Sequence, residues 1–549
     1  MKGPAMKDLK PYVLPLSLAA VQWLATTLLR VDRVFFTYDH VTPWMIATKV
    51  LYFLFLAVAW CFLFAAVRNI RDNKAGWRRG AQVFAVYWPI TLIFQILLWP
   101  GTWSWDDIFT LERISTYESW DPWQHILTGA YDTVLLNVLP FPGGLIFLQN
   151  ILVSICVAFV VTKLESTFRL PKIPLWPVDT LVKVLPFLLP PVLTYQFSGY
   201  RLGMYIYVEL TMLVMLLCAW KDKKEWSWKY TFLFTFLAVV TCLWRTESLV
   251  YVPFILLLLL CTRKDVLPKL KKIVSMVLVV VCFAGIYGFQ SRLIGNDSYQ
   301  VMSLMRPTAV LVRAADPEAD KDALATIDKV VSVEAIRAKD DLNGEQLFWE
   351  DDVLREGFTA DEYSAMSSAM VELAKKYPNV VLNERWQLFV KGSGWDADTV
   401  RCLPYSMEAY RPGSEIDSAL ILQKHQWPGN TPISREVRER TIHFLALRKM
   451  NGTLKQKSNK LLWNAFIPEA VLILAWLFCL VRRKWWPFGL LSAVLLKLPV
   501  VFLTEPARWF MYQLSFYLLG FTVLLYGVLR GVEWCIAKRN AKKETLNNE

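Results

Sequence analysis

Twelve long apolar segments run through this chain, and each approaches the length that a helix needs to cross a lipid bilayer. A hydrocarbon core about 30 Å thick requires roughly 20 apolar residues per helix. The segments begin near Pro11, Trp44, Ala81, Gly144, Leu181, Leu202, Tyr230, Leu249, Ile273, Trp463, Pro487 and Phe510. Because 55% of the 549 residues are hydrophobic, the sequence predicts an all-α polytopic membrane protein with about 12 transmembrane helices.

The net charge of +13 comes largely from short loops beside the apolar segments, which argues against a nucleic-acid-binding surface. Basic clusters occur at every second loop: Lys2 to Lys10, Arg68 to Arg79, Lys163 to Lys172, Lys221 to Lys229, Arg263 to Lys272, Arg482 to Lys484 and Lys538 to Lys543. The positive-inside rule therefore predicts a protein of the plasma membrane with both termini in the cytoplasm. It also favours two short spans over one long helix between Tyr230 and Cys261, since one span would move the later basic loops outside.

A hydrophilic region interrupts the apolar segments between Ser291 and about Lys460. We expect residues 291–460 to form a mainly α extracytoplasmic domain, inserted between the ninth and tenth spans. Residues 1–80 are then an N-terminal pair of helices, 81–290 a membrane core, and 461–549 three helices with a cytoplasmic tail. Within the insertion, Thr359-Ala-Asp-Glu362 predicts a capping box that opens a helix running to Lys376, and 318–338 and 434–450 are also helical in pattern.

The third apolar segment ends in Trp99-Pro-Gly-Thr-Trp-Ser-Trp-Asp-Asp-Ile108, which opens a large outer loop, 100–143. Tryptophan favours the membrane interface, and adjacent carboxylates there must be solvated, paired or engaged in chemistry. The simpler interpretation of Asp106 and Asp107 is a helix start, where acids complement the helix dipole. Further along, apolar residues of 126–138 recur at helical spacing, which predicts an amphipathic helix lying on the outer leaflet.

Charged residues inside or beside the spans gather toward the predicted outer side, which indicates an outward-facing polar cavity. They are Arg201, Glu209, Arg245, Glu247, Glu469, Lys497, Glu505 and Arg508. Arginines at this depth suit the phosphate of an anionic lipid, although they could instead reach to headgroups. Glu209, Glu469 and Lys497 fit a structural ion pair as well as a substrate role. No C-x-x-C zinc site is present, and we predict no metal cofactor, although adjacent carboxylates would suit a divalent ion.

The motifs resemble the multi-spanning GT-C glycosyltransferases, especially bacterial members that use polyprenyl-phosphate sugars. The resemblance rests on Pro100-Gly-Thr-Trp-Ser-Trp-Asp-Asp107, Trp123-Gln-His-Ile126, Arg245-Thr-Glu247 and Ala507-Arg-Trp-Phe-Met-Tyr512. It implies a GT-C-like membrane core and an outer-loop aspartate as catalytic base, with Asp106 favoured over Asp107. Substrate binding would involve Arg245, Glu247, Arg508, Arg201, His125 and Trp105. His125 is equally compatible with interfacial packing, and the tryptophans with interfacial anchoring.

The resemblance implies transfer of a sugar from a polyprenyl-phosphate donor to an extracytoplasmic saccharide, glycopolymer or glycolipid. A polyprenyl-phosphate sugar synthase and a flippase would then act upstream. A carboxylate can take the proton of the acceptor hydroxyl, and phosphate leaves with little need for protonation. Two alternatives stay open: a flippase or transporter of lipid-linked saccharide, and a polymerase or ligase that moves a whole chain. The sequence has no paired repeat of the kind that transporters often show.

Overall fold

The computed structural model describes residues 5–222, 224–294, 298–340, 342, 347–395, 431–447 and 456–548. Across these ranges the regular elements are helices, and the only β-type pairings are two isolated bridges. Nine of the helices are long and apolar enough to cross a membrane. Their bounds are Pro11–Leu28, Pro43–Arg71, Ala75–Leu97, Pro142–Phe168, Leu202–Ala219, Lys269–Ile294, Ser458–Val481, Trp485–Thr504 and Leu514–Arg539. The all-α, polytopic membrane architecture expected from the sequence is confirmed.

The other three predicted spans are less regular. The segment near Leu181 forms α7 (Trp176–Val184) and a 3-10 turn, then bends by 75° into α8 (Pro190–Gln196). The bend falls at Leu189, whose backbone is extended because a proline follows it. Helices α10 (Trp228–Trp244) and α11 (Tyr251–Cys261, preceded by the 3-10 turn η3, Thr246–Val250) are shorter than the nine. Among the described residues, the expected twelve spans therefore correspond to nine long helices, one bent pair and two short helices.

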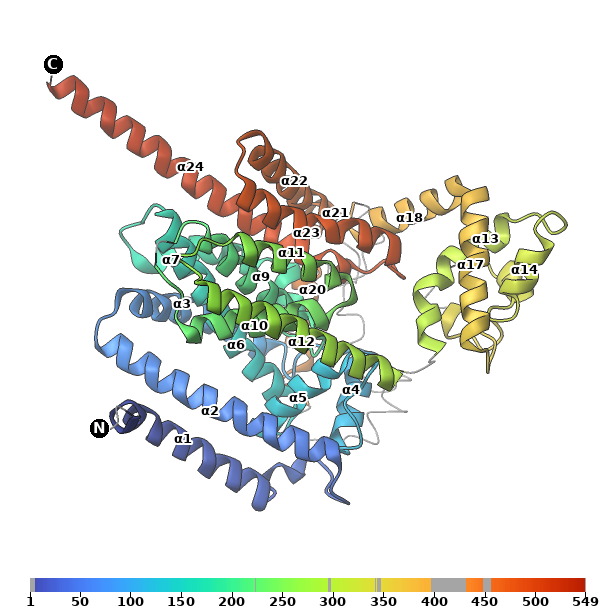
Figure 1. The fold of residues 1–549 in the computed structure, drawn as a ribbon, viewed down its shortest axis with the longest axis horizontal. Helices are drawn as coiled ribbons and strands as arrows, with labels where there is room; N and C mark the ends of the chain where they lie inside the picture. The colour runs from blue at the N-terminus through green and yellow to red at the C-terminus, as the bar shows by residue number, and fades with distance from the viewer. Residues whose placement is uncertain are drawn as a thin grey trace.

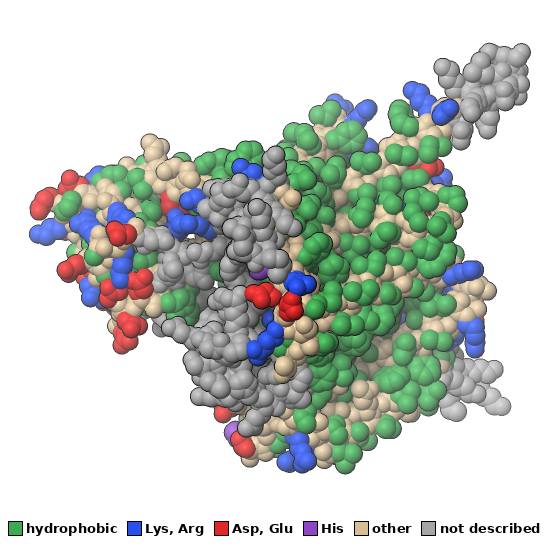
Figure 2. Space-filling model, turned by 180° about the vertical axis from the view of Figure 1, so that it is seen from behind, with side chains coloured by type: hydrophobic (Ala, Val, Ile, Leu, Met, Phe, Trp, Pro, Cys, Tyr) green, Lys and Arg blue, Asp and Glu red, His purple; other side chains and the backbone are tan. Residues whose placement is uncertain are grey.

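The helices pack as a bundle around α9 (Leu202–Ala219), which is buried along almost its whole length. Helix α6 (Pro142–Phe168) packs between α3 (Ala75–Leu97) and α9. Helices α1 (Ala5–Leu28) and α2 (Pro43–Arg71) form one side of the bundle, while α22 (Phe466–Val481), α23 (Trp485–Thr504) and α24 (Leu514–Asn548) lie on the opposite side (Figure 1). Hydrophobic side chains cover a broad face of this bundle, as a lipid-facing surface requires (Figure 2).

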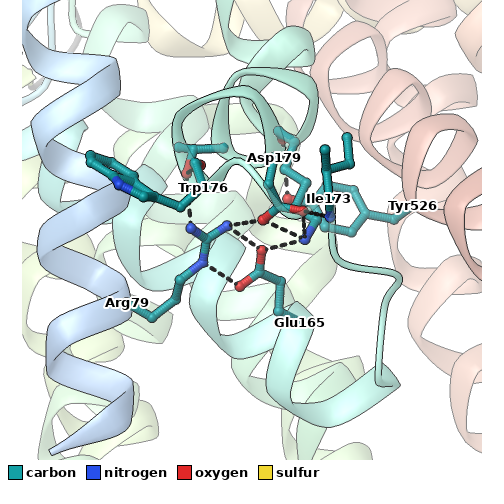
Figure 3. A network of polar contacts seen from close by, with 8 residues as sticks. Arg79, Glu165, Ile173, Trp176, Asp179 and Tyr526 are labelled. Carbon is teal, nitrogen blue, oxygen red and sulfur yellow. Dashed lines mark hydrogen bonds and ion pairs between the residues drawn. The ribbon is translucent and has the colours of Figure 1, made fainter.

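A network of ion pairs joins four helices of the bundle (Figure 3). The guanidinium of Arg79 on α3 bonds both Glu165 on α6 and Asp179 on α7, each at 2.6 Å. Lys183 contacts the same two carboxylates at 2.7 and 2.8 Å, and its backbone carbonyl accepts from the hydroxyl of Tyr526 on α24. Two cations face two carboxylates, so the charges balance. We therefore assign the network a structural role: its ion pairs connect α3, α6 and α7, and the Tyr526 hydrogen bond connects α7 to α24.

The inserted region contains a helical unit with its own apolar cluster, which lies to one side of the bundle in Figure 1. It comprises α13 (Met302–Ala314), α14 (Lys321–Ile327), α15 (Val333–Ala338) and α17 (Ala360–Lys376). The capping box predicted at Thr359 and Glu362 is present, and α17 ends at Lys376, just before Pro378, as expected. Helix α18 (Pro378–Gly392) leads from this unit back to α23.

Two helices near the predicted outer loop pack more tightly than the sequence indicated. Helix α20 (Arg435–Leu445) contacts α3 and α8, and Arg438 bonds the carbonyls of Leu98 and Gly101. Helix α5 (Ile126–Val138) forms where predicted, but both its apolar and its polar faces are buried. The expectation that 126–138 lies on the membrane surface is therefore wrong. Its polar side is covered by protein, and Lys49 and Trp244 donate hydrogen bonds to Asn137 and Thr128 on that side.

Candidate functional site

The carboxylate pair lies in the first turn of α4 (Trp105–Ser115). Ser104 precedes the helix with extended backbone angles, and its backbone N–H donates to Asp107 Oδ2 at 3.0 Å. Asp107 is 5% exposed, whereas Asp106 is exposed to solvent. Both acids also complement the helix dipole, so the simpler interpretation of them as a helix start is confirmed. The side chain of Trp105, predicted to bind substrate, lies outside the described part of the structure.

A short backbone pairing holds the motif against the segment that leads into α9. Thr102 N–H donates to Phe197 C=O at 2.8 Å, and Gly199 N–H donates to Thr102 C=O at 3.0 Å. The Trp103 ring lies directly over Gly199, where a Cβ atom would come within 2.2 Å of it. Since Arg201 follows two residues later, this pairing positions its side chain beside the start of α4. Nothing in the sequence pattern predicted this contact.

Arg201 joins the motif to the loop that precedes α5. Its Nη1 donates to the Gln124 carbonyl at 2.6 Å, while its Nε is buried and has no hydrogen-bond partner among the described residues. Its charge acts on both Asp107 and His125. The structure therefore brings together three predicted site residues, Arg201, Asp107 and His125, from separate parts of the chain.

The surroundings fix the protonation of Asp107 and His125. Burial raises the pKa of Asp107 to about 8, against the opposing effects of the Ser104 hydrogen bond and the Arg201 charge. Burial, helped by the positive charge of Arg201, lowers the pKa of His125 to about 3. His125 is therefore neutral at physiological pH, and its Nδ1 accepts from Leu127 N–H at 3.2 Å at the start of α5. This contact gives His125 a structural role in capping α5.

Sequence reasoning missed Asp132, a buried acid on α5 whose negative charge interacts with that of Asp107. No described residue donates a hydrogen bond to its carboxylate, although it is only 3% exposed. The available signal was its position as the one acid in the apolar segment 126–138. Such a residue is costly to bury and marks a cavity or a functional site.

A second arginine cluster lies at the break between α10 and η3. Arg245 is 4% exposed, its Nε is hydrogen-bonded to Glu247, and its Nη1 has no partner among the described residues. The Tyr512 ring lies 5.8 Å from the guanidinium carbon, and Tyr200 is close enough to act on its charge. Tyr200 immediately precedes Arg201 in the chain. Glu247 is engaged as the ion-pair partner of Arg245.

Arg508 lies in the segment between α23 and the 3-10 turn η7 (Phe510–Tyr512), four residues before the tyrosine that packs on Arg245. It is half-buried. The structure thus places Arg508 on the chain segment that borders the second arginine cluster.

Two of the three charges expected to pair do so. Lys497 Nζ lies 2.6 Å from Glu209 Oε1, and both side chains are 1% exposed. Glu209 also accepts from Tyr251 at 2.5 Å and from Ser515 at 2.6 Å. With every oxygen occupied, this pair is a structural tie between α9, α11, α23 and α24. Glu469 does not join it, because its Oε1 has no partner among the described residues.

A buried polar cluster, which the sequence did not predict, connects the N-terminal helices to α5 and to the residue Tyr117 that follows α4. Lys49 on α2 contacts Asp32 at 2.6 Å and Asn137 of α5 at 2.5 Å. Asp32 also accepts from Tyr38 at 2.5 Å and from Tyr117, just after α4, at 3.1 Å. The N-terminal pair therefore supports α4 and α5 directly.

No group of three or more His, Cys, Asp or Glu side chains in the described ranges is arranged to hold a metal ion. No known protein family, curated protein sequence or solved structure matches this chain. In its described residues the chain is a polytopic, all-α membrane protein in which the predicted site residues include carboxylates of α4 and three arginines, of which Arg245 is buried. We call the segments that carry these residues the α4 end, comprising residues 99–132, 197–201, 245–247 and 508–512.

Proposed function

We propose that this protein is a GT-C-like glycosyltransferase that moves a sugar from a polyprenyl-phosphate donor to a saccharide, glycopolymer or glycolipid acceptor. One observation supports the proposal: Arg201, whose charge acts on Asp107, and the buried Arg245 each keep a buried guanidinium N–H without a partner among the described residues. A buried, unpaired donor is costly. An anionic ligand such as a lipid phosphate would satisfy both groups.

In the proposed reaction, an acceptor hydroxyl attacks the anomeric carbon of the donor sugar. The new carbon–oxygen bond forms as the bond between that carbon and the phosphate oxygen breaks. The bonding electrons leave with polyprenyl phosphate, whose charge Arg201 and Arg245 hold. Asp106 takes the hydroxyl proton as general base. Asp106 suits this role better than Asp107, because Asp107 is buried and its Oδ2 is occupied by Ser104 N–H.

We further propose that the α4 end faces the extracytoplasmic side and that both termini are cytoplasmic. The basic loops support this orientation through the positive-inside rule. A donor made by a cytoplasmic polyprenyl-phosphate sugar synthase would then reach the site through a flippase. Cytosolic nucleotide sugars would have no direct access to it.

Mass spectrometry of the donor consumed tests the substrate class. Purified protein in liposomes should convert a polyprenyl-phosphate monosaccharide to free polyprenyl phosphate only when an acceptor saccharide is present. Translocation of the lipid-linked sugar without formation of a glycosidic bond would identify a flippase instead. Consumption only of lipid-linked chains would identify a polymerase or ligase.

A further inference from the structure

A second group of buried polar side chains lies where the inserted region meets the bundle, away from the α4 carboxylates. It is formed by Glu469 near the start of α22, Glu505 just after α23, and Gln513 just before α24. The last residue of α18, Gly392, approaches so closely that a Cβ atom there would come within 2.2 Å of Glu505 Oε1. The group therefore lies against the helix that connects the inserted unit to the bundle.

Three acceptor oxygens in this group have no donor in the part of the chain that the structure describes. Glu469, Glu505 and Gln513 are 4%, 1% and 0% exposed, respectively. The Oε1 atom of each is buried and has no hydrogen-bond partner in the described ranges. The Gln513 amide nitrogen lies 3.4 Å from Glu505 Oε2, so the amide points toward the carboxylate. Unsatisfied buried acceptors are rare and imply a missing donor or cation.

The charges around the group do not balance. Arg306 and Arg385 both pair with Glu384 of α18. Arg385 also donates to the backbone carbonyls of Leu503 and Glu505, at 3.3 and 2.8 Å, while Glu505 Oε1 has no hydrogen-bond partner among the described residues. When all three are ionised, the carboxylates of Glu384, Glu469 and Glu505 face two guanidinium groups, which leaves one excess negative charge.

The charged groups that act on Glu505 come from α18 and α22. Burial raises the pKa of Glu505 well above its ordinary value; Arg385 opposes this effect, and Glu469 and Glu384 add to it. An ionised Glu505 beside an ionised Glu469 thus needs a compensating positive charge. The charge of Glu469 acts on Glu505 and the Gln513 amide lies 3.4 Å from the Glu505 carboxylate, so a cation bound among these three side chains would supply this charge.

We propose that the Oε1 atoms of Glu469, Glu505 and Gln513 bind one monovalent metal cation of the sodium type. Carboxylate and amide oxygens are the ligands that hard cations prefer. A single positive charge matches the single excess negative charge. Because the ligands come from α22, the end of α23 and the start of α24, and because α18 covers Glu505, the ion stabilises the junction between the inserted unit and the bundle.

Thermal unfolding of the full chain in detergent tests the site, with sodium chloride replacing choline chloride at constant ionic strength and pH. A ligand bound only by the folded protein raises Tm as its concentration increases. We expect a saturable rise with sodium in the wild type. We expect this response to be lost in Glu505→Gln and Glu469→Gln, each of which removes the excess negative charge.

Glu165→Gln is the matched control, because it removes a buried carboxylate from the network of Figure 3. It should lower Tm and keep the sodium response. A wild-type Tm that does not respond to sodium, potassium or lithium between pH 6 and 9 would overturn the proposal and assign the excess charge to a bound proton. A sodium response retained in both Glu→Gln variants would overturn it as well.

Discussion

Asp106 and Asp107 are neighbours in sequence with different environments, and this difference sets their roles. Successive residues of a helix point about 100° apart, so one acid faces solvent while the next faces Ser104 and the protein interior. The sequence identified the pair and the helix start. It could not separate the two acids, because the environment of Asp107 includes the charges of residues distant in sequence, Arg201 and Asp132.

The raised pKa of Asp107 predicts how stability depends on pH. Its pKa is 3.8 in the unfolded chain and about 8 in the folded protein. The folded state therefore retains a proton that the unfolded state loses, and Asp107 destabilises the protein progressively as pH rises from about 4 to about 8. Asparagine keeps an acceptor for Ser104 N–H and cannot ionise. Asp107→Asn should consequently show a smaller fall in Tm between pH 5 and pH 8 than the wild type, and an equal fall would contradict the assignment.

Arg201 provides a direct test of the proposed phosphate site. Removing a charge-assisted hydrogen bond to phosphate costs about 1.5–3 kcal/mol, so Arg201→Gln should raise the KM for the lipid-linked donor about tenfold or more. Tm should fall only slightly, since the variant loses one hydrogen bond, to the Gln124 carbonyl, while the wild-type Nε is already unsatisfied among the described residues. Arg113→Gln, on the same α4 helix and 4.0 Å from Asp121, is the control. Equal donor KM values for the two variants would argue against a phosphate role for Arg201.

Local sequence signals predicted where the helices begin and end, but they did not predict which other helices each one packs against. The Thr359 capping box and Pro378 correctly bounded α17, and prolines account for the broken helix at Leu189. The periodicity of 126–138 correctly gave α5 but misplaced it at the surface. Periodicity identifies a polar face without saying whether water or protein covers it, and here Lys49 and Trp244 come from helices distant in sequence.

The pairing between the motif and the start of α9 predicts that Gly199 cannot carry a side chain. A Cβ atom would lie 2.2 Å from the Trp103 ring, and overpacking of this kind costs about 1–3 kcal/mol. Gly199→Ala should lower both Tm and transferase activity, because the shift would move Arg201 away from α4. Gly285→Ala, with no atom within 4 Å of the new Cβ, should leave both unchanged or raise Tm slightly. A neutral Gly199→Ala would contradict the pairing.

At the scale of the whole molecule, the sequence predicted the membrane class and the position of nearly every apolar helix. Length and hydropathy carry that information locally. The contacts that assemble the α4 end were not predictable, since each joins distant segments: Thr102 with Phe197, Arg201 with Gln124, and Lys49 with Asn137. The sequence therefore predicted which residues belong to the candidate site. How those residues are arranged could be described only from the folded structure.

The buried pair Lys49 and Asp32, which joins the N-terminal helices to α5, is expected to contribute strongly to stability. Lys49→Met would leave Asp32 buried without its cation, and breaking a buried ion pair in this way costs about 3–5 kcal/mol. We expect a marked fall in Tm and loss of activity, because Asp32 accepts a hydrogen bond from Tyr117 and Lys49 donates one to Asn137 of α5. Adding Asp32→Asn to Lys49→Met should recover much of the Tm. Additive losses in the double variant would show that the two residues do not act as a pair.

If the α4 end catalyses the proposed sugar transfer with Asp106 as base, replacing Asp106 must slow the chemical step. Transfer from a polyprenyl-phosphate sugar is followed in liposomes for wild type, Asp106→Asn and the control Glu118→Gln, an exposed acid of the same loop. General-base catalysis contributes about 10²–10⁴-fold, so Asp106→Asn should lose at least about a hundredfold in kcat with unchanged Tm, while Glu118→Gln retains wild-type activity. Full transfer by Asp106→Asn would contradict the account.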